Sequence, residues 1–237
     1  MTVKLRPLKL HLHVLFWCLS GLFPASCGRS PVPEVHVLEK KYVFALSEEK
    51  PVVKSLPADT SYLELIFKTG DLVDVNTLDS SILVDLRYSD TNNFMHRGFY
   101  DGLKKAYFTC EMALKLCNAQ TFLREADSTL SLIVFDAARP LHIQQMMWDS
   151  LKMGPKEKAR YLAPPGSTSL HNYGCAVDVS VCDRSSKKLL DMGTGFDSFS
   201  LLSQPSQEER LLKKGELTEQ VLFNRRLLRE VMSRAGL

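Results

Sequence analysis

The chain of 237 residues is 45% hydrophobic and 24% charged, with 12 glycines and 11 prolines, as expected of a globular protein with enough material for one core. These values exclude a disordered chain, a collagen and a small disulfide scaffold. Three of the 30 Lys and Arg residues lie in the first 27 positions, where no acid occurs, so the remainder carries 27 basic and 27 acidic groups. Such a balanced surface does not favour nucleic acid as a partner.

The N-terminus predicts an export signal over residues 1–27. A basic stretch precedes an apolar run at residues 10–23, and small residues with Cys27 follow it. The run is shorter than the about 20 residues that a membrane-spanning helix needs. Cys27 after small residues is similar to a bacterial lipoprotein signal, so lipidation of Cys27 and ordinary secretion remain alternatives. Both place the mature chain in the periplasm or cell envelope, with membrane contact only through a lipid anchor.

The segment after the signal predicts a tether over residues 28–60. Four prolines interrupt it, and only residues 41–46 have the pattern of a strand. Everything from residue 61 to residue 237 is predicted to form one domain.

Within that domain, hydrophobic spacing predicts a mixture of strands and helices. The expected elements, in chain order, are a strand at 82–88, a helix at 106–126, a strand at 130–135, a helix from Pro140 to about 153, a strand at 175–182 and a mostly helical stretch at 208–235. A polar turn at 183–188 favours a hairpin there. The mixture indicates an α+β fold, a single domain with a central, mainly antiparallel sheet flanked by helices.

Four cysteines lie in the predicted domain: Cys110, Cys117, Cys175 and Cys182. The first two are seven residues apart on one expected helix, so about 10 Å of helical rise separates them and they cannot pair with each other. An exported protein can keep disulfides, so a cross-pairing with Cys175 or Cys182 and four buried free thiols both remain open.

The segment 169–178, SLHNYGCAVD, concentrates the residues that can carry chemistry. The imidazole of His171 and the carboxylate of Asp178 are both suitable Zn²⁺ ligands. Strand alternation alone would send the two side chains to opposite faces, but Gly174 can supply a bend that brings them together. Taken alone, the two residues are also compatible with an ordinary hydrogen-bonded pair.

Four segments occur in order along the domain: residues 88–94 (YSDTNNF), 135–140 (FDAARP), 169–178 and 191–197 (DMGTGFD). The second contains D-x-x-R-P and the third reads S-x-H-x-x-G-x-A-x-D. Together they resemble the motifs of the D-alanyl-D-alanine dipeptidases, the VanX type of bacterial zinc metallopeptidase. The resemblance extends from about residue 60 to the last residue.

The resemblance implies a Zn²⁺ cofactor held by His171, Asp178 and a third ligand, a histidine. In the family this histidine lies in a C-terminal segment that also carries a glutamate, the general base. No such segment precedes Leu237, so the domain is expected to be C-terminally incomplete and the activity of this chain is left open. Cys175 and Cys182 are not expected to replace the missing ligand.

The resemblance also implies roles for four other residues. Arg139 would be a catalytic residue that stabilises the oxyanion, although pairing with Asp136 on a turn is the structural alternative. Asp197 would bind the free ammonium of the substrate, and Ser169 and Tyr88 would line the substrate pocket. Tyr88 is equally compatible with the core and Ser169 with a plain loop.

The function implied is zinc-dependent hydrolysis of the small dipeptide D-Ala-D-Ala, in cell-wall turnover or D-alanine salvage. One alternative is a related carboxypeptidase acting on longer peptidoglycan stems. The other is a catalytically inactive remnant or binding module of the same fold. The oligomeric state is not predicted.

Overall fold

The computed structural model describes residues 61–167 and 169–237. The predicted signal peptide, the tether, its strand at 41–46 and Cys27 lie outside these residues. None of the described helices is long and apolar enough to cross a membrane.

The central sheet is built around β4 (Leu130–Asp136), which lies between β2 (Leu83–Val84) and β5 (Asp178–Asp183). All seven residues of β4 are buried, as its continuous apolar run predicts. The pairing of β4 with β5 is antiparallel, whereas its pairing with β2 is parallel. The sheet is therefore mixed, and the prediction of a mainly antiparallel sheet is correct only for the β4–β5 side.

The parallel pairing follows from the connection between β2 and β4. The chain leaves β2, forms the long helix α3 (Cys110–Ala126) and returns to the sheet as β4, and a crossover through a helix delivers a parallel strand. Helix α3 begins four residues later than predicted. Tyr107 and Phe108 form the short strand β3, and Thr109 caps the helix by accepting from the Met112 backbone N–H.

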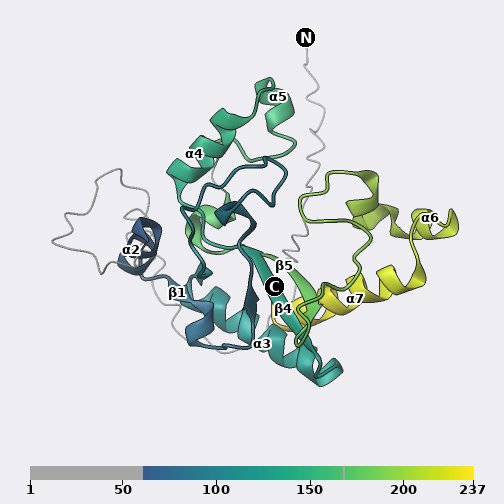
Figure 1. Cartoon of the computed structure of the whole chain (residues 1–237). Coiled ribbons are helices and arrows are strands. Elements are labelled where there is room, and N and C mark those ends of the chain that lie inside the picture. The colour runs from purple at the N-terminus through teal and green to yellow at the C-terminus, as the bar shows by residue number, and fades with distance from the viewer. Residues whose placement is uncertain (1–60, 168) are drawn as a thin grey trace, which may run out of the picture.

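Helices lie at both ends of the central sheet. Figure 1 shows α3 and α7 (Glu219–Arg234) packed together at one end of the sheet and α4 (Leu141–Ser150) at the other. The buried side chains of α3 recur at three- and four-residue spacing and pack on β4. The predicted stretch at 208–235 is two helices, because Gly215, at φ +72°, lies in the turn between α6 (Glu208–Lys213) and α7.

Shorter elements complete the described part of the domain. They are α2 (Tyr62–Thr69), β1 (Val73–Asp74), which pairs with β3 (Tyr107–Phe108), α5 (Pro155–Lys158), and the 3₁₀ helices η1 (Val75–Thr77), η2 (Arg87–Ser89), η3 (Leu170–Tyr173), η4 (Leu201–Ser203) and η5 (Pro205–Gln207). The strand predicted at 82–88 pairs only through β2, because the chain turns into η2 at Arg87.

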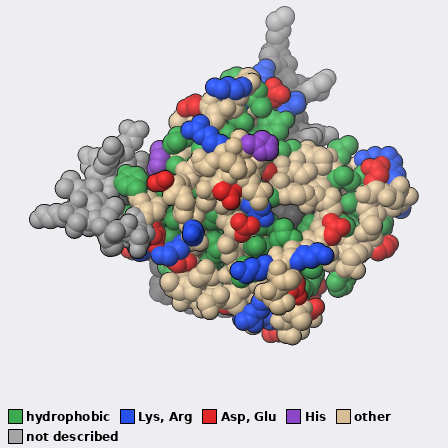
Figure 2. Space-filling model, viewed as in Figure 1, with side chains coloured by type: hydrophobic (Ala, Val, Ile, Leu, Met, Phe, Trp, Pro, Cys, Tyr) green, Lys and Arg blue, Asp and Glu red, His purple; other side chains and the backbone are tan. Residues whose placement is uncertain are grey.

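The cysteines and the charges are distributed without a dominant cluster. Cys110, Cys117, Cys175 and Cys182 are free thiols, so no cross-pairing forms among them. Figure 2 shows acidic and basic side chains interspersed over the visible face of the molecule, in keeping with the balanced composition.

Candidate metal and catalytic site

The candidate site lies where two strands of the central sheet meet. Asp136, the last residue of β4, is paired in register with Asp178, the first residue of β5. The loop that follows β4 carries Arg139, and the turn that precedes β5 carries His171 on η3. The pairing of these strand ends therefore brings all four side chains into one neighbourhood.

The turn before β5 is closed by local hydrogen bonds. The Ser169 hydroxyl accepts from the His171 backbone N–H at 3.3 Å, and the Asn172 side chain accepts from the Ser169 N–H at 2.8 Å. Gly174 ends the turn at φ +66°, the left-handed region that suits glycine. This is the bend that the sequence predicted, and Ser169 acts here as a helix cap.

His171 is buried and oriented for ligation through its Nε2 atom. Its Nδ1 lies 2.8 Å from the Ala137 carbonyl oxygen, which can only accept, so Nδ1 carries the proton and Nε2 has the lone pair. Nε2 lies 3.6 Å from Oδ1 of Asp178. Two ligands bound tetrahedrally to zinc at about 2.0–2.2 Å lie roughly 3.3–3.6 Å apart, so this donor pair fits the ion.

The charges around this pair favour the ionised form of the Asp178 carboxylate. Burial raises the pKa of Asp178, but the charges of His171 and Arg139 outweigh it and lower the pKa below its ordinary value. Burial lowers the pKa of His171, whereas the carboxylates of Asp178 and Asp136 more than compensate and raise it. A metal ion would therefore compete with a proton for the imidazole.

Asp136 lies close enough to join the same metal group, since its carboxylate and the ligand atoms of His171 and Asp178 are all within 4.8 Å of one another. Its oxygens are already occupied. Oδ1 accepts from the Tyr100 hydroxyl at 2.5 Å and from the Ala137 N–H at 2.9 Å, and Oδ2 pairs with the Arg139 guanidinium. We therefore assign Asp136 to Arg139 rather than to the metal, and the ion pair foreseen as an alternative is present.

Backbone contacts tie the arginine loop to the histidine turn. The Arg139 N–H donates to the His171 carbonyl at 2.8 Å, and the Asn172 amide donates to the Arg139 carbonyl at the same distance. The Arg139 side chain is buried beneath Tyr88, with its guanidinium 5.3 Å from the centre of that ring. The guanidinium and the candidate metal ligands thus belong to one hydrogen-bonded unit.

Tyr88 also contacts the remaining predicted residue, Asp197. The Tyr88 hydroxyl donates to Oδ2 of Asp197 at 2.8 Å. Burial raises the pKa of Asp197 to about 7; the hydrogen bond from Tyr88 opposes this rise, and the charges of Asp178 and Asp136 add to it. Asp197 adopts φ +55°, a left-handed conformation that costs energy outside glycine and is often found at functional sites.

The structure thus brings together Arg139, His171, Asp178, Tyr88 and Asp197, and places Ser169 in the turn beside His171. Sequence reasoning missed Tyr100 and Asn172, which hold the site through their hydroxyl and amide groups. Tyr100 lies outside the four motifs, and Asn172 occupies an unspecified position of the S-x-H-x-x-G-x-A-x-D pattern, so the sequence gives no signal for either role.

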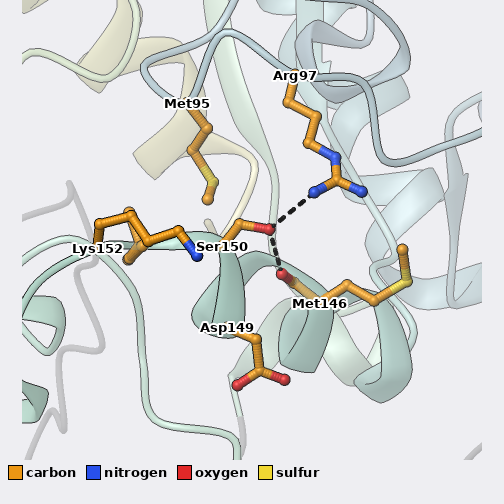
Figure 3. A pocket seen from close by; sticks show the side chains of 7 residues that line it. Met95, Arg97, Met146, Asp149, Ser150 and Lys152 are labelled. Atoms are coloured by element: carbon orange, nitrogen blue, oxygen red, sulfur yellow. Dashed lines mark hydrogen bonds between the residues drawn. The ribbon is translucent and has the colours of Figure 1, made fainter.

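A surface pocket among the described residues lies away from these side chains. It has a volume of about 590 Å³ and lies at the end of α4, where the Arg97 guanidinium donates to the Ser150 hydroxyl (Figure 3). Its lining includes Met95, Met146, Asp149, Leu151 and Lys152, and none of the candidate site residues. The site is therefore identified by its chemistry, not by its volume.

A buried imidazole, an ionised carboxylate and a guanidinium around one point are the groups of a metal-dependent hydrolase. The profile of the family described as D-ala-D-ala dipeptidase matches residues 68–237, and the chain belongs to this peptidase family. The resemblance read from the four motifs is thereby confirmed.

A curated relative agrees with this assignment. Over 133 residues the chain is 29% identical to the D-alanyl-D-alanine dipeptidase of Escherichia coli (strain K12). The match covers 54% of this chain and 62% of the relative, so the chain spans less than two thirds of that protein's length.

Proposed function

We propose that this chain carries the zinc site and the substrate pocket of a peptidase that hydrolyses D-Ala-D-Ala. The observation that carries the proposal is the 3.6 Å separation of His171 Nε2 and Asp178 Oδ1 beside the buried guanidinium of Arg139. Family membership supports the reaction class, and the chemistry of the ligands supports zinc.

His171 and Asp178 would hold the ion, which supplies Lewis acidity and a water of lowered pKa when it is bound. Arg139 offers fixed N–H donors to the oxygen that becomes negative as the peptide carbonyl is attacked. Asp136 holds those donors in place and balances the positive charge in the resting site.

Asp197 and Tyr88 would select the substrate. Among the described residues no cation forms an ion pair with Asp197, whose carboxylate accepts from Tyr88. The ammonium group of a dipeptide would supply that missing charge. A longer peptide presents a neutral amide at the same place and leaves the carboxylate unpaired, so dipeptides are favoured over peptidoglycan stems.

The group formed by Asp136, His171 and Asp178 contains no glutamate that could act as the general base. It also provides no third protein ligand, because Asp136 is paired with Arg139. By family resemblance, a glutamate and a histidine from a C-terminal segment would complete the site. Without them, the chain would be a binding module that recognises the dipeptide without cleaving it, which is the second candidate function.

The decisive experiment compares this chain with a version extended by the family's Glu- and His-bearing segment. Bound zinc is measured by mass spectrometry and D-Ala release by amino-acid analysis, with a longer stem peptide as a second substrate. We expect release only from the dipeptide and only by the extended chain, with zinc lost from both chains in His171→Ala. Absence of release by the zinc-loaded extended chain would refute the peptidase proposal, and preferential cleavage of the stem would favour a carboxypeptidase.

We also propose that the chain is exported and that its N-terminal signal is removed, before Cys27 if the chain is lipidated. Mass spectrometry of the protein from bacterial envelopes distinguishes the two routes. Lipidation predicts an acylated Cys27 at the new N-terminus and its loss in Cys27→Ala. Ordinary secretion predicts an unmodified N-terminus and no effect of that substitution, and retention of residues 1–27 would contradict export.

A further inference from the structure

The Asp136 carboxylate is held by more than its ion pair with Arg139. Its Oδ1 atom accepts two hydrogen bonds, one from the backbone N–H of Ala137 and a shorter one, at 2.5 Å, from the Tyr100 hydroxyl. The Ala137 bond fixes the carboxylate from within its own loop. The Tyr100 bond reaches it from a part of the chain 36 residues away, and His171 Nδ1 lies 3.7 Å from the other oxygen, Oδ2.

Tyr100 is itself immobilised. Its side chain is 1% exposed, and its ring meets the Tyr88 ring edge to face, with the centres 6.0 Å apart. The Tyr100 N–H donates to the Tyr88 carbonyl at 3.0 Å, and the Tyr100 carbonyl accepts from Leu103 at 2.9 Å. Its hydroxyl therefore has little freedom to leave Asp136.

The same hydroxyl also accepts from Arg139 Nε at 3.4 Å. Tyr100 thus contacts both members of the ion pair, donating to the acid and accepting from the base. We propose that Tyr100 is a positioning residue, whose hydroxyl holds Asp136 on Arg139 and so fixes the guanidinium in the orientation that meets the reacting carbonyl. This inference rests on the proposed function for its catalytic consequence.

The consequence follows from how a fixed donor works. Donors stabilise a developing negative charge best when they need no rearrangement, and a displacement of about 1 Å can cost roughly 100-fold in rate. Without the Tyr100 hydroxyl, Oδ1 of Asp136 keeps only the hydrogen bond from the Ala137 N–H. Arg139 Nε loses the acceptor that it has among the described residues. The guanidinium should then sample other orientations, while the ring packing is unchanged.

The test compares Tyr100→Phe with Tyr107→Phe. Tyr107 is a matched control, because it is 2% exposed and its hydroxyl also donates to a buried carboxylate, that of Glu64, at 2.8 Å. Both variants remove one buried tyrosine–carboxylate bond, so general destabilisation should be similar. The direct measurement is the ¹⁵N–¹H resonance of Arg139 Nε, assigned with Arg139→Gln, and its hydrogen-exchange rate.

We expect exchange at Arg139 Nε to be at least tenfold faster in Tyr100→Phe and unchanged in Tyr107→Phe. Unchanged exchange in Tyr100→Phe, or the same acceleration in both variants, overturns the proposal. Site-specific incorporation of 3-fluorotyrosine at residue 100 gives a second reading that leaves the fold intact. It should shift the Arg139 Nε resonance but not that of Arg225, which binds Met192, Leu202 and Glu208; absence of an Arg139 shift also counts against the proposal.

Kinetics of the extended, zinc-loaded chain supply the catalytic reading. Tyr100→Phe should lower kcat for D-Ala-D-Ala about tenfold and leave KM within about twofold, because the substrate-binding Asp197 keeps its contact with Tyr88. An unchanged kcat would contradict the catalytic consequence. If no form hydrolyses the dipeptide, the proposed function fails, whereas the Nε measurement still decides whether Tyr100 positions Arg139.

Discussion

Asp197, a carboxylate that forms no ion pair within residues 61–167 and 169–237, shows most directly how one residue can both weaken the fold and prepare a site. Its pKa of about 7 lies above the ordinary value of 3.8, so between these pH values the folded chain keeps a proton that the unfolded chain has lost. Its favourable contribution is therefore complete below about pH 4 and disappears as the pH rises through 7.

The substitution Asp197→Asn should remove this penalty in the metal-free protein. Asparagine keeps an acceptor for the Tyr88 hydroxyl and tolerates the left-handed backbone, so the free energy of unfolding should rise by about 1–3 kcal/mol at pH 8 and change little at pH 4. Urea unfolding in the presence of a chelator measures both values.

Asp101→Asn is the matched control, because Asp101 also has a positive φ, +46°, but is exposed. It should change the free energy of unfolding by less than about 0.5 kcal/mol, as is usual for a surface substitution. Equal effects of Asp197→Asn at the two pH values would contradict the argument from burial.

At the scale of elements, the close approach of α3 to the turn before β5 depends on Gly174, which has no side chain. The Thr109 N–H, at the cap of α3, donates to the Gly174 carbonyl at 3.0 Å. A Cβ atom on Gly174 would lie 3.2 Å from that nitrogen and 3.1 Å from Cδ2 of Leu72. A side chain at residue 174 would therefore require the Thr109 backbone or the Leu72 side chain to move by a few tenths of an ångström.

Gly174→Ala should therefore displace the turn that carries His171. We expect a loss of about 1–3 kcal/mol in unfolding free energy, from the left-handed backbone and the crowding together, and at least tenfold weaker zinc binding. Denaturation and competition with a metal-binding dye measure the two effects. Gly102→Ala separates them, since Gly102 has φ +71° but no neighbour near its Cβ position; it should lose stability alone. Equal zinc affinities of the two variants would argue against the coupling.

The elements also show where sequence reasoning succeeds and where it stops. The apolar run of β4 and the spaced side chains of α3 are determined by local pattern, so both were predicted. The parallel pairing with β2 depends on a crossover that no local pattern reports. Likewise, His171 and Asp178 were recognised by their motif, whereas Tyr100 acquires its role only through a contact 36 residues away.

At the scale of the whole molecule, α7 holds the segment that carries Asp197. Arg225 donates to the backbone carbonyls of Met192 and Leu202 and pairs with Glu208, which Arg229 binds through both oxygens. One buried carboxylate therefore joins α6 to α7. Burial raises the pKa of Glu208, but the bonds and charges of the two arginines lower it below the ordinary value of 4.5.

Glu208→Gln should loosen this segment in a pH-dependent way. A lowered pKa gives stability that is present above about pH 4.5 and is lost as the pH falls through the folded-state value. We expect a loss of about 1–3 kcal/mol at pH 7 that is smaller at pH 3, and faster amide exchange over residues 191–199. Glu209→Gln, at an exposed neighbouring position, should have no effect, and an equal loss at both pH values would contradict the ionic origin of the contact.

The reciprocal hydrogen bonds between the Ala137–Arg139 loop and His171 limit how this chemistry can be transplanted. The imidazole takes its tautomer from the Ala137 carbonyl, and the Arg139 backbone is anchored on the His171 carbonyl. A protein engineer who grafted either loop alone onto another scaffold would lose the orientation of both side chains. The smallest portable unit is therefore the two loops together with the strand ends from which they emerge.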